Sequence, residues 1–264
     1  DWLLPTTEIK YLLRDTKRDE SVATVSATLD LAGSCSASGA DPVSAVVGPA
    51  SSGPAAASAE LFASFEIPQI SYSATSPSLS DGEEFPYFLR TPPSDAFQAE
   101  GIADILANQW KYTHVGTVSS ADLYGIAGIA AFSSAAALYG IEIVTAATIA
   151  DSGPVDHQLD ILARANVRVI VLFCDASSAG RFLTAAYARG LGGPGWLWFG
   201  SDSASKPELW RSQPSIANNE TLREEVLRGY FGIIPSSRRD SDAYRAYMDR
   251  LRAHPSTLGN GTHC

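Results

Sequence analysis

The sequence is poor in cysteine, histidine and methionine: its 264 residues include three Cys, four His and one Met. Three cysteines are too few for a scaffold held together by disulfides, and the odd count leaves at least one without an internal partner. No Cys-x-x-Cys pair or Cys/His cluster has the spacing of a zinc site. We therefore expect no structural metal and no cofactor.

Positive charge is also scarce. Lys and Arg number 19 against 29 Asp and Glu, so the formal net charge is −10 and the pI is about 4.8. A nucleic-acid-binding surface needs clustered basic residues, and the longest local runs here are Lys17-Arg18 and Arg238-Arg239. The composition predicts no nucleic-acid partner.

Long hydrophobic runs are absent. The most lightly charged stretch, residues 126–150, contains only Glu142, but Ser133-Ser134 and Gly140 interrupt it. A bilayer span needs about 20 predominantly apolar residues, so a helix, a glycine stop and a strand fit this stretch better. The chain begins at Asp1 without an initiator Met, and we expect a piece of a longer protein whose membrane link lies outside these residues.

Enzyme signatures are missing as well. There is no G-x-S-x-G, H-E-x-x-H or P-loop motif. The glycine-rich segment 190–195 follows a predicted helix and precedes a strand, the reverse of the order in a dinucleotide-binding loop. Each of the four histidines (His114, His157, His254 and His263) could belong to a hidden triad. No nucleophile–base pair can be named, so we predict that the chain is not an enzyme.

What the sequence does contain is an alternation of short apolar runs with helical patterns. Strands are predicted over 9–14, 43–47, 68–72, 113–118, 141–144, 167–173 and 196–199. Helices are predicted over 20–31, 54–65, 94–109, 123–138, 155–165, 177–189 and 241–253. Continuously apolar strands such as 167–173 are buried on both faces, which is typical of a parallel sheet covered by helices. The predicted class is α/β with doubly wound sheets.

Two breaks divide the alternation. Pro92-Pro93 can continue neither a helix nor a central strand, and a second break lies near residues 233–237. Crossovers at these points would join two sheets into a clamshell with a cleft between its lobes.

Polar residues follow several predicted strands, at the sheet edge where α/β proteins bind ligands. Ser51-Ser52 lead into a helix whose free N–H groups could hold a carboxylate, although a simple helix cap is the favoured interpretation. Ser73 and Thr75 lie in a second hydroxyl cluster or an ordinary turn.

Three further residues have two interpretations each. Asp95, with Gln98 three residues later, forms a capping box, which favours a structural role. Tyr124 could present its ring to an ammonium group or pack half-buried. Asp202, after the strand 196–199, could hold an amino group or start a turn.

Taken together, these segments resemble a known family. Residues 46–52 (VVGPASS) and 67–76 (IPQISYSATS) are similar to the ligand-binding "Venus flytrap" domain of class C G-protein-coupled receptors, within it the metabotropic glutamate and calcium-sensing branch. Pro93-Ser94-Asp95, Tyr124-Gly125 and Gly200-Ser201-Asp202 continue the match. The resemblance implies two lobes, a partial lobe 1 (1–91 and 236–264) and lobe 2 (92–235), joined by hinge strands.

The resemblance also implies a site for an α-amino acid. The residues it assigns are Ser52 and Thr75 for the ligand carboxylate, Ser73 lining the pocket, Asp95, Tyr124 and Asp202 for the ammonium group, and Arg250 for the distal carboxylate of a glutamate-like ligand. The ligand would bridge two lobes and favour their closure. A zwitterion that leaves water needs donors at one end and anionic or aromatic groups at the other.

The family further implies a receptor on the extracellular face of the plasma membrane and a homo- or heterodimer through lobe 1. The helix with Leu61, Phe62 and Phe65 is a candidate contact, unless those side chains form its core face. Asn219 and Asn260 begin glycosylation sequons, whereas the partners of Cys35 and Cys264 stay open. The alternatives are a periplasmic-type amino-acid-binding protein, or the same module on a membrane cyclase or ion channel.

Overall fold

The computed structural model describes residues 10–17, 21–33, 42–206, 208–235 and 241–253. The chain divides into two units, Asp1–Ile234 and Pro235–Cys264, and both sheets belong to the first. Helix α10 (Asp242–Ala253) belongs to the second unit. Several features that the sequence singles out lie outside the described residues: Cys35, Cys264, His254, His263, Arg238-Arg239 and the sequon at Asn260.

The smaller sheet has three parallel strands in the order β1 (Val46–Val47), β2 (Gln69–Ser71) and β3 (Phe88–Arg90). Helix α2 (Ser52–Ala63) follows β1, and α1 (Val22–Leu31) precedes it. Gln69 and Ser58 are both buried and satisfy each other: the Ser58 hydroxyl donates to Gln69 Oε1 at 3.0 Å, and Gln69 Nε2 donates to the Ala55 carbonyl at 3.1 Å. These bonds fix α2 against β2.

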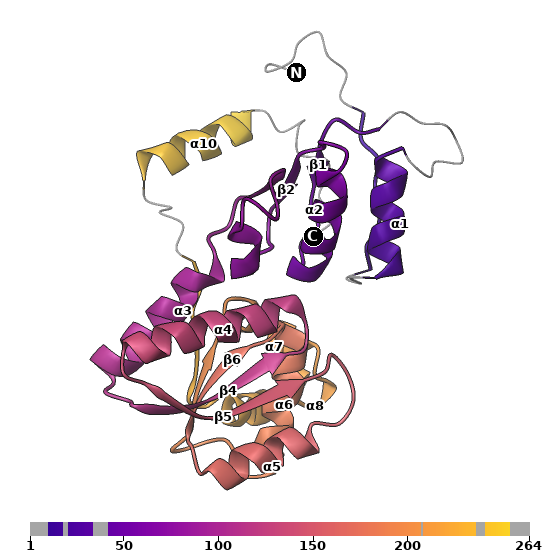
Figure 1. The fold of residues 1–264 in the computed structure, drawn as a ribbon. Coiled ribbons are helices and arrows are strands. Elements are labelled where there is room, and N and C mark those ends of the chain that lie inside the picture. The colour runs from indigo at the N-terminus through magenta and orange to yellow at the C-terminus, as the bar shows by residue number, and fades with distance from the viewer. Residues whose placement is uncertain (1–9, 18–20, 34–41, 207, 236–240, 254–264) are drawn as a thin grey trace. The chain divides into compact units, whose positions relative to one another are not determined.

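The larger sheet has five parallel strands in the order β5-β4-β6-β7-β8. Their bounds are β4 His114–Ser120, β5 Glu142–Ile149, β6 Val169–Phe173, β7 Leu197–Gly200 and β8 Tyr230–Gly232. Figure 1 labels β5, β4 and β6, which lie side by side in that order. The helices between them are α3 (Asp95–Asp104, continued as a π-helix over Ile105–Gln109), α4 (Leu123–Leu138), α5 (Asp156–Ala165) and α6 (Ala176–Ala188). The chain winds from β4 outward to β5 and then reverses through β6, which makes the sheet doubly wound, as predicted.

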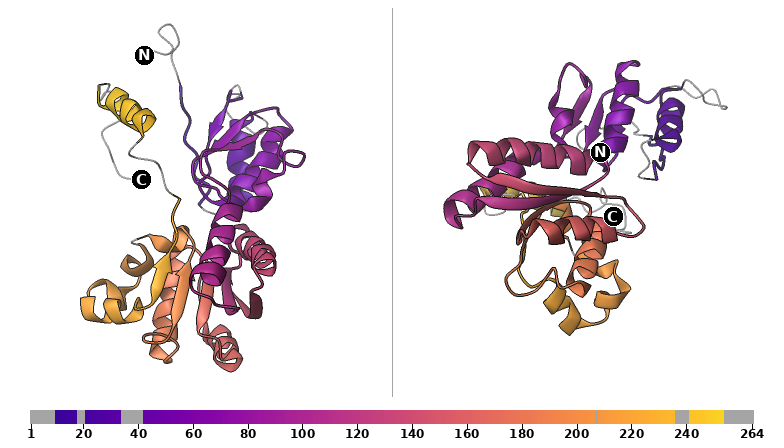
Figure 2. Two further views of the ribbon diagram at one scale, coloured as in Figure 1. Left: turned by 90° about the vertical axis from the view of Figure 1, so that its left-hand side faces the viewer. Right: turned by 60° about the horizontal axis from the view of Figure 1, so that its bottom comes forward.

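Helices cover both faces of the larger sheet, as Figures 1 and 2 show. Alternate residues of β6 point to opposite sides: Ile170 and Leu172 pack with α5 and α6, whereas Val171 and Phe173 pack with α3 and α4. All five residues of β6 are buried. The double cover explains why this strand reads as one continuous apolar run.

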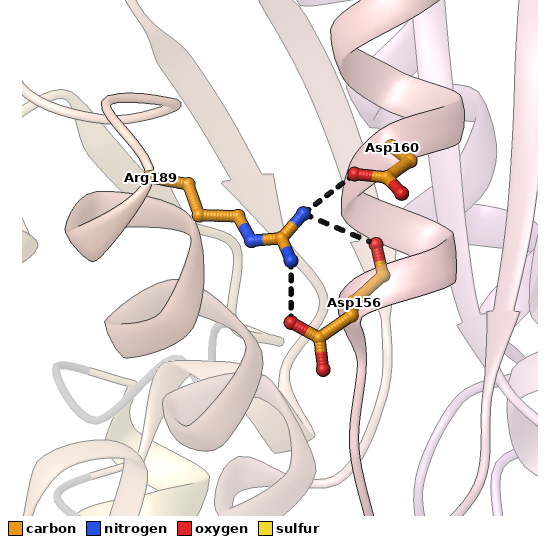
Figure 3. Close-up of polar contacts among 3 residues, drawn as sticks. All are labelled: Asp156, Asp160 and Arg189. Atoms are coloured by element: carbon orange, nitrogen blue, oxygen red, sulfur yellow. Dashed lines mark hydrogen bonds and ion pairs between the residues drawn. The ribbon is translucent and has the colours of Figure 1, made fainter.

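Arg189, at the C-terminus of α6, joins α6 to α5 (Figure 3). Its guanidinium donates to Asp156 Oδ1 at 2.5 Å and to Asp160 Oδ1 at 2.6 Å. All three side chains are more than one-third exposed, so these ion pairs contribute about 1 kcal/mol or less. Burial of the apolar faces, rather than this contact, holds the two helices on the sheet.

Most predicted elements are confirmed, and α4 has the predicted bounds. The strand predicted over 9–14 is wrong for its described part: residues 10–14 pair with no strand, and Tyr11 and Leu13 are about 80% exposed. The strand predicted over 43–47 is reduced to β1, which has two residues. Strands β3 and β8 were not predicted, nor were the short helices α7 (Glu208–Arg211), α8 (Pro214–Ala217) and α9 (Glu220–Val226).

Within the described ranges, no helix combines the length and apolar character that crossing a membrane requires. Phe62 on α2 is only 2% exposed and belongs to a small core cluster, so for this residue the core interpretation is correct. Phe65, just after α2, is 40% exposed.

Candidate ligand-binding site

A cavity of about 1460 Å³ is lined by residues from loops at the carboxyl ends of strands in both sheets. The loops after β1 and β2 contribute Ser52, Ser73 and Thr75 to its lining. Tyr124, after β4, and Ser203, after β7, contribute from the larger sheet. Carboxyl ends of parallel strands are the usual ligand-binding edge of α/β sheets, above all where the strand order reverses.

The hydroxyl-bearing side of the cavity is built around the start of α2. Ser51 occupies the cap position, but its side chain makes no capping hydrogen bond. The Ser52 hydroxyl, 3% exposed as a residue, instead accepts from the Ser76 N–H at 3.2 Å and ties the loop after β2 to the helix. The interpretation of these serines as a simple cap is therefore wrong. The helix start leaves backbone N–H groups and hydroxyls beside one cavity, an arrangement suited to a carboxylate.

Tyr124, after β4 of the larger sheet, places a phenol on the side of the cavity opposite these hydroxyls. It is 8% exposed, so the half-buried interpretation understates its burial. Its hydroxyl lies 2.9 Å from Asp202 Oδ1 and 2.8 Å from Ser201 Oγ. Burial, with the negative charges of Asp202 and Asp95, raises the pKa of Tyr124 well above its usual value. The phenol therefore stays protonated and can orient the Asp202 carboxylate.

Asp95 is fully buried at the first turn of α3. Its backbone N–H donates to the Thr75 carbonyl at 2.9 Å. The helix cap is Ser94, whose hydroxyl accepts from the Ala96 N–H, so the capping-box prediction for Asp95 is wrong. Gln98 reaches the Asp95 carboxylate instead, and Asp95 Oδ2 has no hydrogen-bond partner among the described residues.

The environment of Asp95 raises its pKa to about 7. Burial is the main cause, and hydrogen bonding to the Thr75 side chain opposes it. The Asp202 carboxylate raises the pKa further, whereas the Arg90 guanidinium and the Gln98 amide lower it. Near neutral pH this site can therefore gain or lose one negative charge.

This shift predicts that folding stability falls as the pH rises. The folded-state pKa of about 7 lies above the ordinary value of 3.8, so the folded chain binds a proton between these limits that the unfolded chain releases. In the wild type the Asp95 carboxyl group should lower the free energy of unfolding by on the order of 2 kcal/mol between pH 5 and pH 8. Asp95→Asn should remove this decline, which is measured by urea unfolding. Glu100→Gln on the exposed side of α3 should keep the decline. An identical pH profile for wild type and Asp95→Asn would contradict the assignment.

Six charged residues of the cavity wall were not predicted: Lys10, Arg14 and Asp15 from the N-terminal segment, and Asp122, Asp175 and Lys206 from loops of the larger sheet. Asp122 and Asp175 follow β4 and β6, the two strands at which the sheet order reverses, and their carboxylates cap α4 and α6. Lys206, exposed after β7, also lines the cavity. The signal available for Asp122 and Asp175 was their place just after predicted strands.

The predicted residues thus fall into three groups. Ser52, Ser73, Thr75 and Tyr124 line the cavity. Asp95 and Asp202 do not line the described cavity but are bonded to residues that do: the Asp95 N–H donates to the Thr75 carbonyl, and Asp202 accepts from the Tyr124 phenol. Arg250 is an exposed residue of α10, in the second unit.

Comparison with known proteins settles the family. Residues 1–261 match the model of the receptor family ligand binding region. The chain belongs to this family. It is 33% identical over 244 residues to taste receptor type 1 member 3 of Mus musculus, which covers 86% of this chain and 28% of the relative.

Two metabotropic glutamate receptors are further relatives. Metabotropic glutamate receptor 8 of Homo sapiens is 30% identical over 214 residues, 79% of this chain and 22% of the relative. Metabotropic glutamate receptor 4 of Mus musculus is 33% identical over 208 residues, 75% of this chain and 21% of the relative. These relatives are class C receptors rather than enzymes. The chain is therefore a ligand-binding domain of the class C receptor type, and it spans less than a third of the length of these relatives.

Proposed function

We propose that this domain binds an α-amino acid in the cavity lined by Ser52, Thr75 and Tyr124. The observation that carries the proposal is the opposed chemistry of that lining. Hydroxyls and helix N–H groups on one side suit a carboxylate, while the phenol of Tyr124, backed by Asp202, suits an ammonium group. A free amino acid carries both groups at fixed separation.

The ligand we propose is acidic, of the glutamate type. Three cations line the cavity: Lys10, Arg14 and Lys206. Arg14 is paired with Asp30, and of the other two only Lys206 comes from the larger sheet, so we assign the distal carboxylate to Lys206. The resemblance assigns the same role to Arg250. Two of the relatives are named as glutamate receptors, which supports the same choice.

Binding would signal by closure of two lobes, with bounds at 1–91 plus 236–264 and 92–235. A ligand held from both sheets gains contacts only when they approach each other, so it shifts an open–closed equilibrium. The domain would stand on the extracellular face of the plasma membrane and pair as a homo- or heterodimer through lobe 1, with Phe65 as an exposed candidate contact. Asn219, exposed at the start of α9, would accept a glycan.

The alternative protein classes would use the same ligand-binding cavity. A periplasmic-type binding protein, a membrane cyclase or an ion channel would carry the same module and differ in the segments joined to it. The relatives favour the receptor output, because all those given above are receptors.

The proposal is tested by calorimetric titration of the chain with the twenty L-amino acids. L-glutamate should bind, and Lys206→Ala should weaken it about tenfold while leaving the affinity for L-alanine unchanged. Lys111→Ala, on an exposed loop before β4, is the matched control. Absence of binding by every amino acid would refute the proposal, and equal losses for L-glutamate and L-alanine would refute the role of Lys206.

A further inference from the structure

Gln98 on α3 is bonded to both acidic residues of the site, the buried Asp95 and the partly buried Asp202. Its Nε2 donates to Asp95 Oδ1 at 2.5 Å and to Asp202 Oδ1 at 3.1 Å. Its Oε1 accepts from the Asp202 N–H at 2.9 Å. The residue is 6% exposed and lies behind the cavity wall rather than on it.

The orientation of this amide follows from the charges around it. Rotating the amide by 180° would place Oε1 against the Asp95 and Asp202 carboxylates and Nε2 against the Asp202 N–H. Both changes replace attraction with repulsion. With one bond from each N–H and one to the carbonyl, Gln98 is well satisfied and holds a single orientation.

These bonds join two segments that are 104 residues apart in the sequence. The Thr75 side chain hydrogen-bonds the Asp95 carboxyl group, and the Tyr124 phenol donates to the Asp202 carboxylate, so each carboxylate adjoins a residue of the cavity lining. Gln98 therefore connects the side that carries Thr75 with the loop after β7. A bond to both the backbone and the carboxylate of Asp202 restricts where that carboxylate can lie.

We propose that Gln98 is a positioning residue, whose amide holds the Asp202 carboxylate at a fixed place relative to Asp95 and so orients the ammonium-binding end of the cavity. The proposal rests on the proposed function for its consequence in ligand binding. The claim that Gln98 holds Asp202 near Asp95 is independent of that function, because the coupling between the two carboxylates can be measured without a ligand.

The first experiment is a double-mutant cycle followed by carboxyl ¹³C NMR of Asp95 in the ligand-free chain. The groups that act on the pKa of Asp95 are Thr75 from the loop after β2, Arg90 from β3, and Asp202 and Gln98 themselves. In the wild type, Asp202→Asn should lower the pKa of Asp95, because it removes a neighbouring negative charge. In the Gln98→Met background, Asp202→Asn should lower the pKa of Asp95 by less than about half of the wild-type change, because the Asp202 carboxylate is no longer held near Asp95. Equal lowering in both backgrounds would overturn the proposal.

The second experiment is titration with L-glutamate. Gln98→Met should weaken binding about tenfold. Gln98→Glu places a third carboxylate between two others and should weaken binding more at pH 8 than at pH 5, where its protonated form can still donate a hydrogen bond. Gln158→Met is the matched control, because Gln158 is partly exposed and donates to the Thr148 carbonyl of the edge strand β5, away from Asp95 and Asp202.

The two experiments distinguish a failure of the proposed function from a failure of the role proposed for Gln98. If L-glutamate and the other amino acids do not bind the wild type, the proposed function is refuted while the NMR cycle still decides the role of Gln98. If the cycle shows coupling but Gln98→Met binds L-glutamate as well as the wild type, the claim that Gln98 orients the ligand site is wrong. Circular dichroism of each variant confirms that the chain has folded.

Discussion

Asp202→Ala is expected to weaken binding of L-glutamate about 100-fold. Asp202 accepts hydrogen bonds from the Tyr124 phenol and the Gln98 amide, which aim its charge at the end of the cavity assigned to the ammonium group. Truncation removes the anion and one acceptor from each of these donors, which keep only Ser201 Oγ and Asp95 Oδ1 respectively. The dissociation constant is measured by calorimetry at pH 7.4.

Asp151→Ala controls for the loss of one negative charge from an acidic chain. Asp151 is exposed in the loop after β5, and its removal should change the affinity by less than about twofold. Asp202→Asn keeps an acceptor for both donors but no charge, so its affinity should lie between those of wild type and Asp202→Ala. An affinity of Asp202→Ala within threefold of the wild type would contradict the assignment.

Gly180→Ala is expected to destabilise the domain by about 3 kcal/mol. Gly180 lies in α6 where α7 packs against it, and a methyl group there would overlap the carbonyl oxygen of Leu209 and lie 2.9 Å from its carbonyl carbon. The obstacle is backbone, which cannot rotate away as a side chain can. The helices must separate, and the core cluster that includes Ala179, Leu183 and Leu209 loosens with them. Urea unfolding followed by circular dichroism gives the difference.

The same substitution at Gly82 provides the control. Gly82 is exposed, and a methyl group there would meet no atom within 4 Å. Gly82→Ala should leave the free energy of unfolding within about 0.5 kcal/mol of the wild type. Equal unfolding midpoints for the two variants would contradict the account of α6 and α7.

The strands and helices that could be predicted are those whose sequence pattern reflects full burial. Helix α4 has the predicted bounds, and β6 lies within the predicted 167–173, because both are apolar on the sides that pack. The failures are elements that depend on pairing. Residues 10–14 look extended but have no partner strand, whereas β3 and β8 are three-residue strands defined by their neighbours.

The candidate site was partly predictable for a similar reason. Ser52, Ser73, Thr75 and Tyr124 follow predicted strands, and a parallel sheet brings such positions to one edge. Gln98 could not be found this way, because its bonds to Asp202 cross 104 residues and the local pattern suggested a helix cap. Whether Asp95, Asp202 and Arg250 contact the ligand stays a prediction.

The central claim is that an amino acid binds between the hydroxyls after β1 and β2 and the residues after β4 and β7. It is tested most directly by ¹H–¹⁵N NMR of the chain during titration with L-glutamate. We predict saturable shifts of the backbone amides of Ser52, Thr75, Tyr124 and Ser203, all at the same ligand concentration. Shifts confined to other residues, or no saturable shift at all, would contradict the account.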